Sequence, residues 1–228
     1  SPPKLEMAEG IYDVEIESYE YPMPEEVSSI QGDYEEDVVF SVYIALPEGH
    51  QGDLPLAIIL HGFANPFFES YVDWVEEIAS RGMAVAYIQY PSDVMPPGHD
   101  TFELHEEEGM SNHPYHEPRA VAIDAALEFM VTLLPEEVDT NYLMVGGHSL
   151  GAGYSFLALE WALGNGWGSG ALFVSLEAPY ARPVQDHLQF DNSKLPDNFL
   201  AHVAISEDDM SVSDCFGVHH QALLGENA

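Results

Sequence analysis

The sequence predicts one α/β domain with a mostly parallel central sheet, an antiparallel N-terminal edge and helices on both faces of the sheet. Near the N-terminus, polar and apolar residues alternate, which is typical of an antiparallel strand with one face in water. From Leu54 onward, short continuous apolar runs alternate with helical patterns, as they do in β-α-β units. One such run ends in Gly-His-Ser-Leu-Gly and continues directly into a helical pattern, which predicts a sharp turn between a strand and a helix.

The N-terminal edge is expected to consist of two antiparallel strands. In residues 11–17, Tyr12, Val14 and Ile16 alternate with acidic residues, so one face is apolar and the other is charged. A loop is expected over 21–34, because prolines, serines and a glycine interrupt any regular pattern there. The second strand is expected over 38–46, just before a Pro-Glu-Gly turn.

The remaining elements are expected to alternate along the chain, with right-handed crossovers between parallel strands. The expected buried strands are 56–60, 83–89, 142–145, 171–176 and 199–205, and the expected helices are 68–79, 118–134, 154–163 and 212–224. Gly82 is expected to terminate the first of these helices, and Pro118 and Pro135 to bound the second.

The serine turn carries the chemistry that the residues alone predict. A serine at such a turn has crowded backbone neighbours, so the residues two places before and after it must lack a side chain, and Gly147 and Gly151 meet that need. The turn lifts the Ser149 hydroxyl above the sheet edge and directs the unpaired N–H groups of a helix N-terminus at developing negative charge. Ser149 is therefore predicted to be a nucleophile; a glycine-rich turn that merely contains a serine is the alternative.

Charge is the most unusual property of the composition. The 228 residues include 40 acidic residues but only 5 Lys and Arg residues, which gives a net charge of −35. Such a surface repels nucleic acids and anionic membranes, so neither is an expected partner. The scarcity of lysine indicates adaptation to high salt, where counterions screen the repulsion between carboxylates. A secreted or extracellular location is the favoured expectation, and the cytoplasm of a high-salt organism is the alternative.

An acidic, histidine-rich stretch over 91–117 is expected to form a lid-like insertion within a single domain over 1–228. Its imidazoles and carboxylates include His99, Asp100, Glu103, His105, Glu106, Glu107, Glu108, His113, His116 and Glu117. Groups of this kind can bind Zn²⁺ or Ca²⁺, but no spacing such as His-Glu-x-x-His occurs, so neither a metal nor another cofactor is expected. Cys215 is the only cysteine, which excludes an intrachain disulfide.

Two motifs together give a resemblance to a known family. His61-Gly62-Phe63 follows the third expected strand, and Gly147-His148-Ser149-Leu150-Gly151 follows the fifth. From about residue 37 onward, the chain resembles the α/β-hydrolase superfamily, and within it dienelactone-hydrolase-like and polyester-hydrolase-like esterases. The resemblance implies an α/β-hydrolase fold without its last strand, hence a C-terminally incomplete domain. It also implies an oxyanion hole formed by the backbone N–H groups of Phe63 and Leu150, with the Phe63 side chain lining the acyl pocket.

The resemblance further implies an acid after the strand 199–205. Asp209 matches that position best and Asp208 is the close alternative, while Glu177, after the sixth strand, is a less common placement. Helix capping is the purely structural role for Asp208 and Asp209.

The catalytic histidine should follow the acid in the chain order Ser, acid, His. Only His219 and His220 follow Asp209, and the resemblance implies a further helix and strand before the histidine. The base is therefore expected beyond Ala228, with His219 or His220 serving if the chain is complete. His61 and His148 are expected to pack or form hydrogen bonds rather than to transfer protons.

The leading hypothesis is a serine hydrolase that cleaves small or polymeric carboxylic esters through an acyl-enzyme. A second hypothesis, motivated by the missing base and the extreme charge, is an α/β-hydrolase-fold protein that serves as a binding or assembly module. A peptidase or amidase of the same fold is a third.

Overall fold

The structure, a computed structural model, describes residues 12–28, 39–92, 113–180, 190–197, 199–205 and 224. Its strands are β1 Val14–Glu20, β2 Ser41–Pro47, β3 Leu54–Leu60, β4 Ala84–Ile88, β5 Val138–His148, β6 Ala171–Glu177 and β7 Leu200–Ala204. Its helices are α1 Glu25–Ser28, α2 Val72–Ala79, α4 His113–Val131 and α5 Leu150–Gly164, with short 3-10 helices η2 Phe68–Ser70 and η3 Asn192–Lys194. Within these residues, no helix is both long and apolar enough to cross a membrane.

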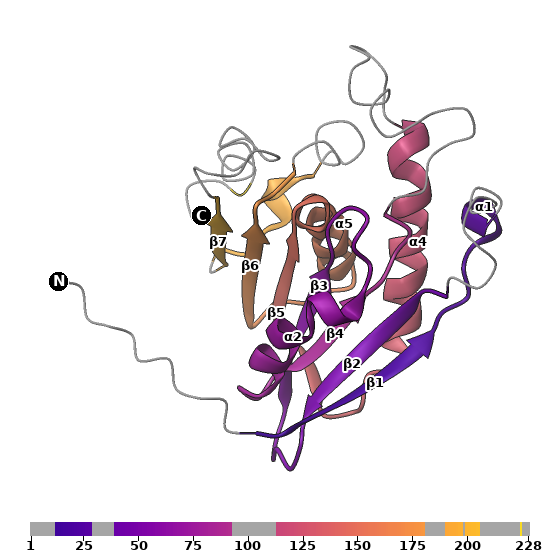
Figure 1. Cartoon of the computed structure of the whole chain (residues 1–228). Helices are drawn as coiled ribbons and strands as arrows, with labels where there is room; N and C mark the ends of the chain where they lie inside the picture. The colour runs from indigo at the N-terminus through magenta and orange to yellow at the C-terminus, as the bar shows by residue number, and fades with distance from the viewer. Residues whose placement is uncertain are drawn as a thin grey trace.

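The strands form one seven-stranded sheet in the order β1-β2-β4-β3-β5-β6-β7 (Figure 1). β2 pairs antiparallel with β1 and β4, whereas all other neighbouring strands are parallel. This order, with its antiparallel edge and a serine turn directly after β5, is that of the α/β-hydrolase fold, as the sequence predicted. In the described part of the chain, β7 is the last strand and forms the edge of the sheet.

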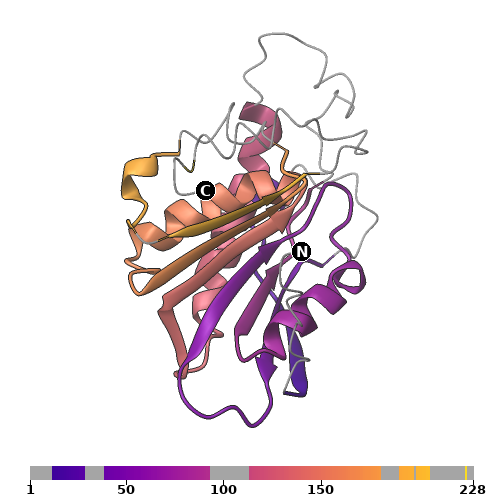
Figure 2. The ribbon, with the colours of Figure 1, turned by 90° about the vertical axis from the view of Figure 1, so that its left-hand side faces the viewer.

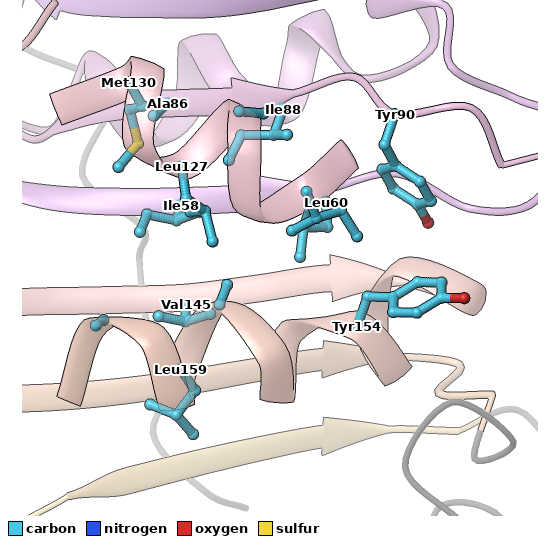
Figure 3. Packing of buried hydrophobic residues seen from close by; sticks show 14 of the residues in the cluster. Ile58, Leu60, Ala86, Ile88, Tyr90, Leu127, Met130, Val145, Tyr154 and Leu159 are labelled. Atoms are coloured by element: carbon cyan, nitrogen blue, oxygen red, sulfur yellow. The ribbon is translucent and has the colours of Figure 1, made fainter. Parts of the chain in front are cut away.

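Helices cover both faces of the sheet (Figure 2). On one face, Leu127 of α4 and Leu159 of α5 pack against Leu60 and Val145 of the central strands (Figure 3). On the other face, α2 packs against a second cluster that includes Ile59. Because alternate residues of β3 face different helix layers, nearly the whole strand is buried, which explains its continuous apolar sequence. The carboxyl ends of β3 and β5 are thereby fixed side by side.

Two boundaries near the N-terminus differ from the sequence prediction. β1 begins at Val14 and continues to Glu20, beyond the strand predicted over 11–17. The predicted loop over 21–34 contains the one-turn helix α1, which follows Pro24 and has two acidic residues in its first turn. Acidic side chains at a helix N-terminus interact favourably with its partial positive charge, and a single turn is too short to show a period in the sequence.

The start of α4 is a further correction, because the helix begins at His113 and Pro118 lies inside it. Pro114 falls in the first turn, where a missing N–H removes no helical hydrogen bond. The buried His116 holds this first part of the helix in place, because its Nδ1 lies 2.7 Å from the Tyr154 hydroxyl of α5. This tertiary contact outweighs the tendency of Pro118 to start or kink a helix. The helix predicted over 212–224, including Cys215, lies outside the described residues except for Leu224.

Candidate active site

Ser149 occupies the turn between β5 and α5. Its backbone has φ 53° and ψ −116°, a conformation that residues with a side chain rarely adopt. Two backbone hydrogen bonds join this turn to β6 and the residues after it: the Ser149 N–H donates to the Glu177 carbonyl at 2.8 Å, and the Tyr180 N–H donates to the Ser149 carbonyl at 3.0 Å. The strained turn expected from Gly-x-Ser-x-Gly is therefore present at the carboxyl end of a central strand.

The glycines on either side of Ser149 allow unusually close backbone packing. A Cβ on Gly147 would lie 2.6 Å from the Gly151 carbonyl oxygen, and one on Gly151 would lie 2.2 Å from the His61 carbonyl oxygen. A Cβ on Gly62 would lie 2.9 Å from His148 Nδ1 and 3.4 Å from Ser149 Cβ. The first turn of α5 and the Ser149 turn therefore rest directly on the loop that follows β3.

Three successive backbone amides in the loop after β3 differ in their hydrogen bonding. The Gly62 N–H donates to the Tyr71 hydroxyl at 2.8 Å, and the Ala64 N–H donates to the Ser92 hydroxyl at 2.9 Å. Between them, the Phe63 N–H has no hydrogen-bond acceptor among the described residues. Leu150 is the first residue of α5, so its N–H has no acceptor within the helix. The two amides that the sequence assigned to an oxyanion hole thus remain open within the described residues.

His61 has a structural position beneath this loop. The side chain is fully buried, and burial is the main reason why its pKa falls to about 4, so the ring is neutral at pH 7. Its Nδ1 lies 2.8 Å from the Gly62 carbonyl oxygen, and its Nε2 accepts the Tyr90 N–H at 3.0 Å. The His61 ring also stacks on the Tyr90 ring at a centroid distance of 4.1 Å. Because both ring nitrogens are occupied, His61 cannot serve as a general base.

Tyr71, at the start of α2, connects the loop after β3 to the residue that precedes Ser149. Its hydroxyl accepts the Gly62 N–H and lies 3.2 Å from His148 Nδ1. Burial raises the pKa of the Tyr71 hydroxyl, an effect that the Gly62 hydrogen bond partly opposes, so the group stays protonated at neutral pH. The contact with Tyr71 gives His148 a packing and hydrogen-bonding role, as expected for the variable position of the turn.

Glu177 contributes its backbone to the Ser149 turn, while its side chain has other partners. The Glu177 carboxylate lies 3.3 Å from His202 Nδ1 of β7 and accepts a hydrogen bond from the Ser175 hydroxyl at 3.3 Å. Both members of the pair with His202 are substantially exposed, so it is a weak surface contact. The other candidates for acid and base, Asp208, Asp209, His219 and His220, lie outside the described residues.

The loop after β3 exposes apolar side chains. Phe63 is 37% exposed and Phe67 is 63% exposed, although both are large hydrophobic residues.

In the expected insertion, residues 93–112 lie outside the described part, and His113–Glu117 form the start of α4. The residues that the structure describes contain no group of three or more His, Cys, Asp or Glu side chains that could hold a metal ion.

Tyr71 and Ser92 are the residues of this site that the sequence did not identify. Ser92 follows β4, which neighbours β3, and the carboxyl ends of parallel neighbours meet at one edge, so its proximity to the loop after β3 could have been inferred. Tyr71 offered no such signal, because it lies within an apolar helical pattern and resembles an ordinary core residue.

Comparisons with known proteins give matches among solved structures only, since no protein-family model and no curated protein matches the chain. The matches include esterase Est22, with 18% identity over 73% of this chain and 45% of that chain and a TM-score of 0.44. They also include brefeldin A esterase, a bacterial homologue of human hormone sensitive lipase, with 17% identity, 77% and 43% coverage and a TM-score of 0.42. A bacterial heroin esterase matches with 16% identity, 90% and 60% coverage and a TM-score of 0.44. The chain thus spans 43–60% of the length of these enzymes.

Proposed function

We propose that this protein is a serine hydrolase that cleaves carboxylic esters through an acyl-enzyme intermediate. One observation carries the proposal: Ser149 is held at a positive φ beside a pair of backbone amides, those of Phe63 and Leu150, that have no acceptor in the described part of the chain. A strained serine next to two open donors is the arrangement that acyl transfer requires, because the donors stabilise the charge that develops on the substrate oxygen.

In the proposed reaction, the Ser149 hydroxyl attacks the acyl carbon of the ester. The carbonyl oxygen becomes an oxyanion and accepts hydrogen bonds from the Phe63 and Leu150 N–H groups. The partial positive charge at the N-terminus of α5 favours the same oxyanion. The tetrahedral intermediate collapses and the alcohol leaves with the proton that Ser149 gave up. Water then attacks the acyl carbon, which releases the carboxylic acid and restores the Ser149 hydroxyl.

A histidine that follows Asp209 in the sequence is proposed to accept the Ser149 proton. His61 is excluded from this role because both of its ring nitrogens form hydrogen bonds. His148 is not proposed for it, because its Nδ1 contacts the Tyr71 hydroxyl. Within this sequence the candidates are His219 and His220. Asp209 is proposed to orient the base, with Asp208 and Glu177 as alternatives; the contact between Glu177 and His202 makes Glu177 the least suited of the three.

The exposed aromatic residues of the loop after β3 and the net charge together favour a neutral ester with an apolar acyl group. Phe63 and Phe67 offer exposed aromatic surface on the loop that carries one proposed oxyanion donor. A net charge of −35 disfavours anionic substrates by long-range repulsion, at least in dilute salt. Small esters and polymeric esters both fit this description.

The substitution Ser149→Ala tests the proposal directly. It is expected to lower kcat on p-nitrophenyl butyrate by at least about 10⁴-fold, because the nucleophile is removed. Labelling of the wild type by a fluorophosphonate probe should be lost in the same variant. The matched control is Ser169→Ala, an exposed serine before β6 whose hydroxyl contacts Asn141, which should hydrolyse and label normally. A wild type that the probe does not label, or a Ser149→Ala variant with full activity, would contradict the proposal.

A further inference from the structure

The hydrogen bonds of the loop after β3 follow a pattern that secondary structure does not explain. The Gly62 and Ala64 amides, one on each side of Phe63, donate to the side-chain hydroxyls of Tyr71 and Ser92, whereas the Phe63 amide between them is open among the described residues. A loop amide that is exposed to water does not need a hydrogen-bond acceptor within the protein. The buried hydroxyls of Tyr71 and Ser92 instead fix the orientation of the peptide groups on both sides of Phe63.

We propose that Tyr71 and Ser92 are positioning residues that hold the Phe63 N–H in the direction of the substrate oxyanion. This inference rests on the proposed function and deepens it. Neither side chain is proposed to touch the substrate; each acts through the backbone of the loop.

Tyr71 sets the distance between the loop after β3 and the nucleophile turn. Its side chain is 6% exposed, so the hydroxyl is held in place by the surrounding core. A single oxygen accepts the Gly62 N–H at 2.8 Å and contacts His148 Nδ1 at 3.2 Å, which joins one residue before Phe63 to one residue before Ser149. Oxyanion donors contribute only when they lie at hydrogen-bond distance from the developing oxyanion, and a misplacement of about 1 Å can cost about 100-fold in rate.

Ser92 fixes the other side of Phe63. Ala64 has a φ of 52°, a strained value for a residue with a side chain, and its N–H donates to the Ser92 hydroxyl at 2.9 Å. Ser92 is fully buried and is itself anchored, because its carbonyl accepts hydrogen bonds from Nε and Nη2 of Arg119 at 2.9 and 2.7 Å. The buried Arg119 guanidinium of α4 thus fixes Ser92, and Ser92 in turn fixes the loop after β3.

A merely structural role would predict a different result from a positioning role. Hydroxyls that only stabilise the fold should affect unfolding and leave the chemistry of the folded enzyme unchanged. Positioning of an oxyanion donor acts on the transition state, so its loss should lower kcat while KM changes little. Binding of a boronic acid, which forms a tetrahedral adduct with the serine, should weaken in parallel.

The experiment compares Tyr71→Phe and Ser92→Ala with Tyr21→Phe in the full chain. Ser92→Ala keeps the carbonyl that Arg119 binds. Tyr21→Phe is the matched control, because it removes a buried tyrosine hydroxyl that donates to the Gln89 carbonyl at 3.0 Å. We expect kcat on p-nitrophenyl butyrate to fall roughly 10- to 100-fold in each test variant and to stay unchanged in the control. The inhibition constant of the boronic acid should rise by the same factor as kcat falls, and urea unfolding of each variant verifies the folded state.

The outcomes separate this inference from the proposed function. A wild type that neither hydrolyses the ester nor reacts with a fluorophosphonate overturns the proposed function and this inference with it. An active wild type, with kcat unchanged in both test variants or lowered equally in Tyr21→Phe, overturns the inference alone. If Tyr71→Phe does not fold, Ser92→Ala decides by the same criteria.

Discussion

At the scale of single residues, backbone strain is concentrated at one edge of the sheet. In the described part of the chain, the non-glycine residues with a positive φ are Ala64, Ser149 and Ala178, at 52°, 53° and 46°. They follow β3, β5 and β6, which are neighbours in the sheet, so all three lie at the same carboxyl edge. Each such conformation costs about 1–3 kcal/mol and persists only where the surroundings hold it. This edge is therefore where we place the chemistry, since strain of this kind is typical of functional sites.

Gly151→Ala is expected to destabilise the protein by about 2–4 kcal/mol, because packed backbone cannot move aside for a new Cβ. The added atom would lie 2.2 Å from the His61 carbonyl oxygen. Gly164→Ala, in the same helix, is the control: nothing lies within 4 Å of its Cβ, and alanine favours the helix by up to about 1 kcal/mol. Urea unfolding measures both. A Gly151→Ala variant as stable as the wild type would mean that α5 does not rest on the loop after β3.

The sequence predicts the local geometry of the candidate site but not the contacts that depend on the fold. Ser149 and its two glycines follow from the steric needs of a five-residue turn. Tyr71 and Ser92, by contrast, act on partners 9 and 28 positions away. The periodicity of the sequence cannot predict these hydrogen bonds, because each depends on the one backbone amide that the hydroxyl contacts in the folded protein.

At the scale of elements, the sequence predicts a strand correctly where both of its faces are buried. It mispredicts a helix boundary where a tertiary contact determines the first residue of the helix. The apolar run of β3 could only be a covered strand, and its alternating residues do face two helix layers. For α4, the sequence predicts a start at Pro118, since proline is favoured at the first position of a helix. The actual start at His113 depends on the contact between His116 and Tyr154, which joins α4 to α5 and has no signature in the sequence.

The packing of α4 also predicts a pH effect. Burial, with a smaller contribution from the neighbouring Glu128 carboxylate, raises the pKa of Asp124 from 3.8 to about 6. The folded protein therefore binds this proton more tightly than the unfolded chain does. The resulting stability is fully present below the unfolded pKa near 3.8 and is lost as the pH rises through about 6.

Asp124→Asn removes this titration and should stabilise the protein, relative to the wild type, more at about pH 7.5 than at about pH 4. Urea unfolding of both proteins at the two pH values gives the difference. Glu128→Gln removes the smaller cause and should give a weaker effect of the same sign. The same stability difference at both pH values would show that Asp124 titrates normally in the folded state.

At the scale of the whole molecule, the acidic charge opposes the fold that the core stabilises. The core clusters on both sheet faces are ordinary in composition, whereas the surface carries a net charge of −35. Some of these charges lie close together in one surface groove of about 430 Å³. The groove is lined by Asp13, which directly precedes β1, and by Asp73, Glu76 and Glu77 of α2. Glu77 is paired with Arg81, but Lys and Arg number only 5 in the chain, so most carboxylates cannot be paired in this way. Repulsion of this kind is reduced by salt rather than by contacts within the protein.

The stability of the wild type should therefore rise with KCl, steeply at first and less once the Debye length falls to about 3 Å near 1 M. Urea, an uncharged denaturant, is suited to measure it. The double variant Asp13→Asn with Glu76→Gln removes two carboxylates from the groove. It leaves Glu77, which pairs with Arg81, and Asp73, whose negative charge interacts favourably with the N-terminus of α2. This variant should be more stable than the wild type at about 0.1 M KCl and equally stable at about 2 M, because salt then screens what the substitutions remove. A wild type with the same unfolding midpoint at both concentrations would show that the acidic surface costs the fold nothing, and adaptation to high salt would then lose its physical basis.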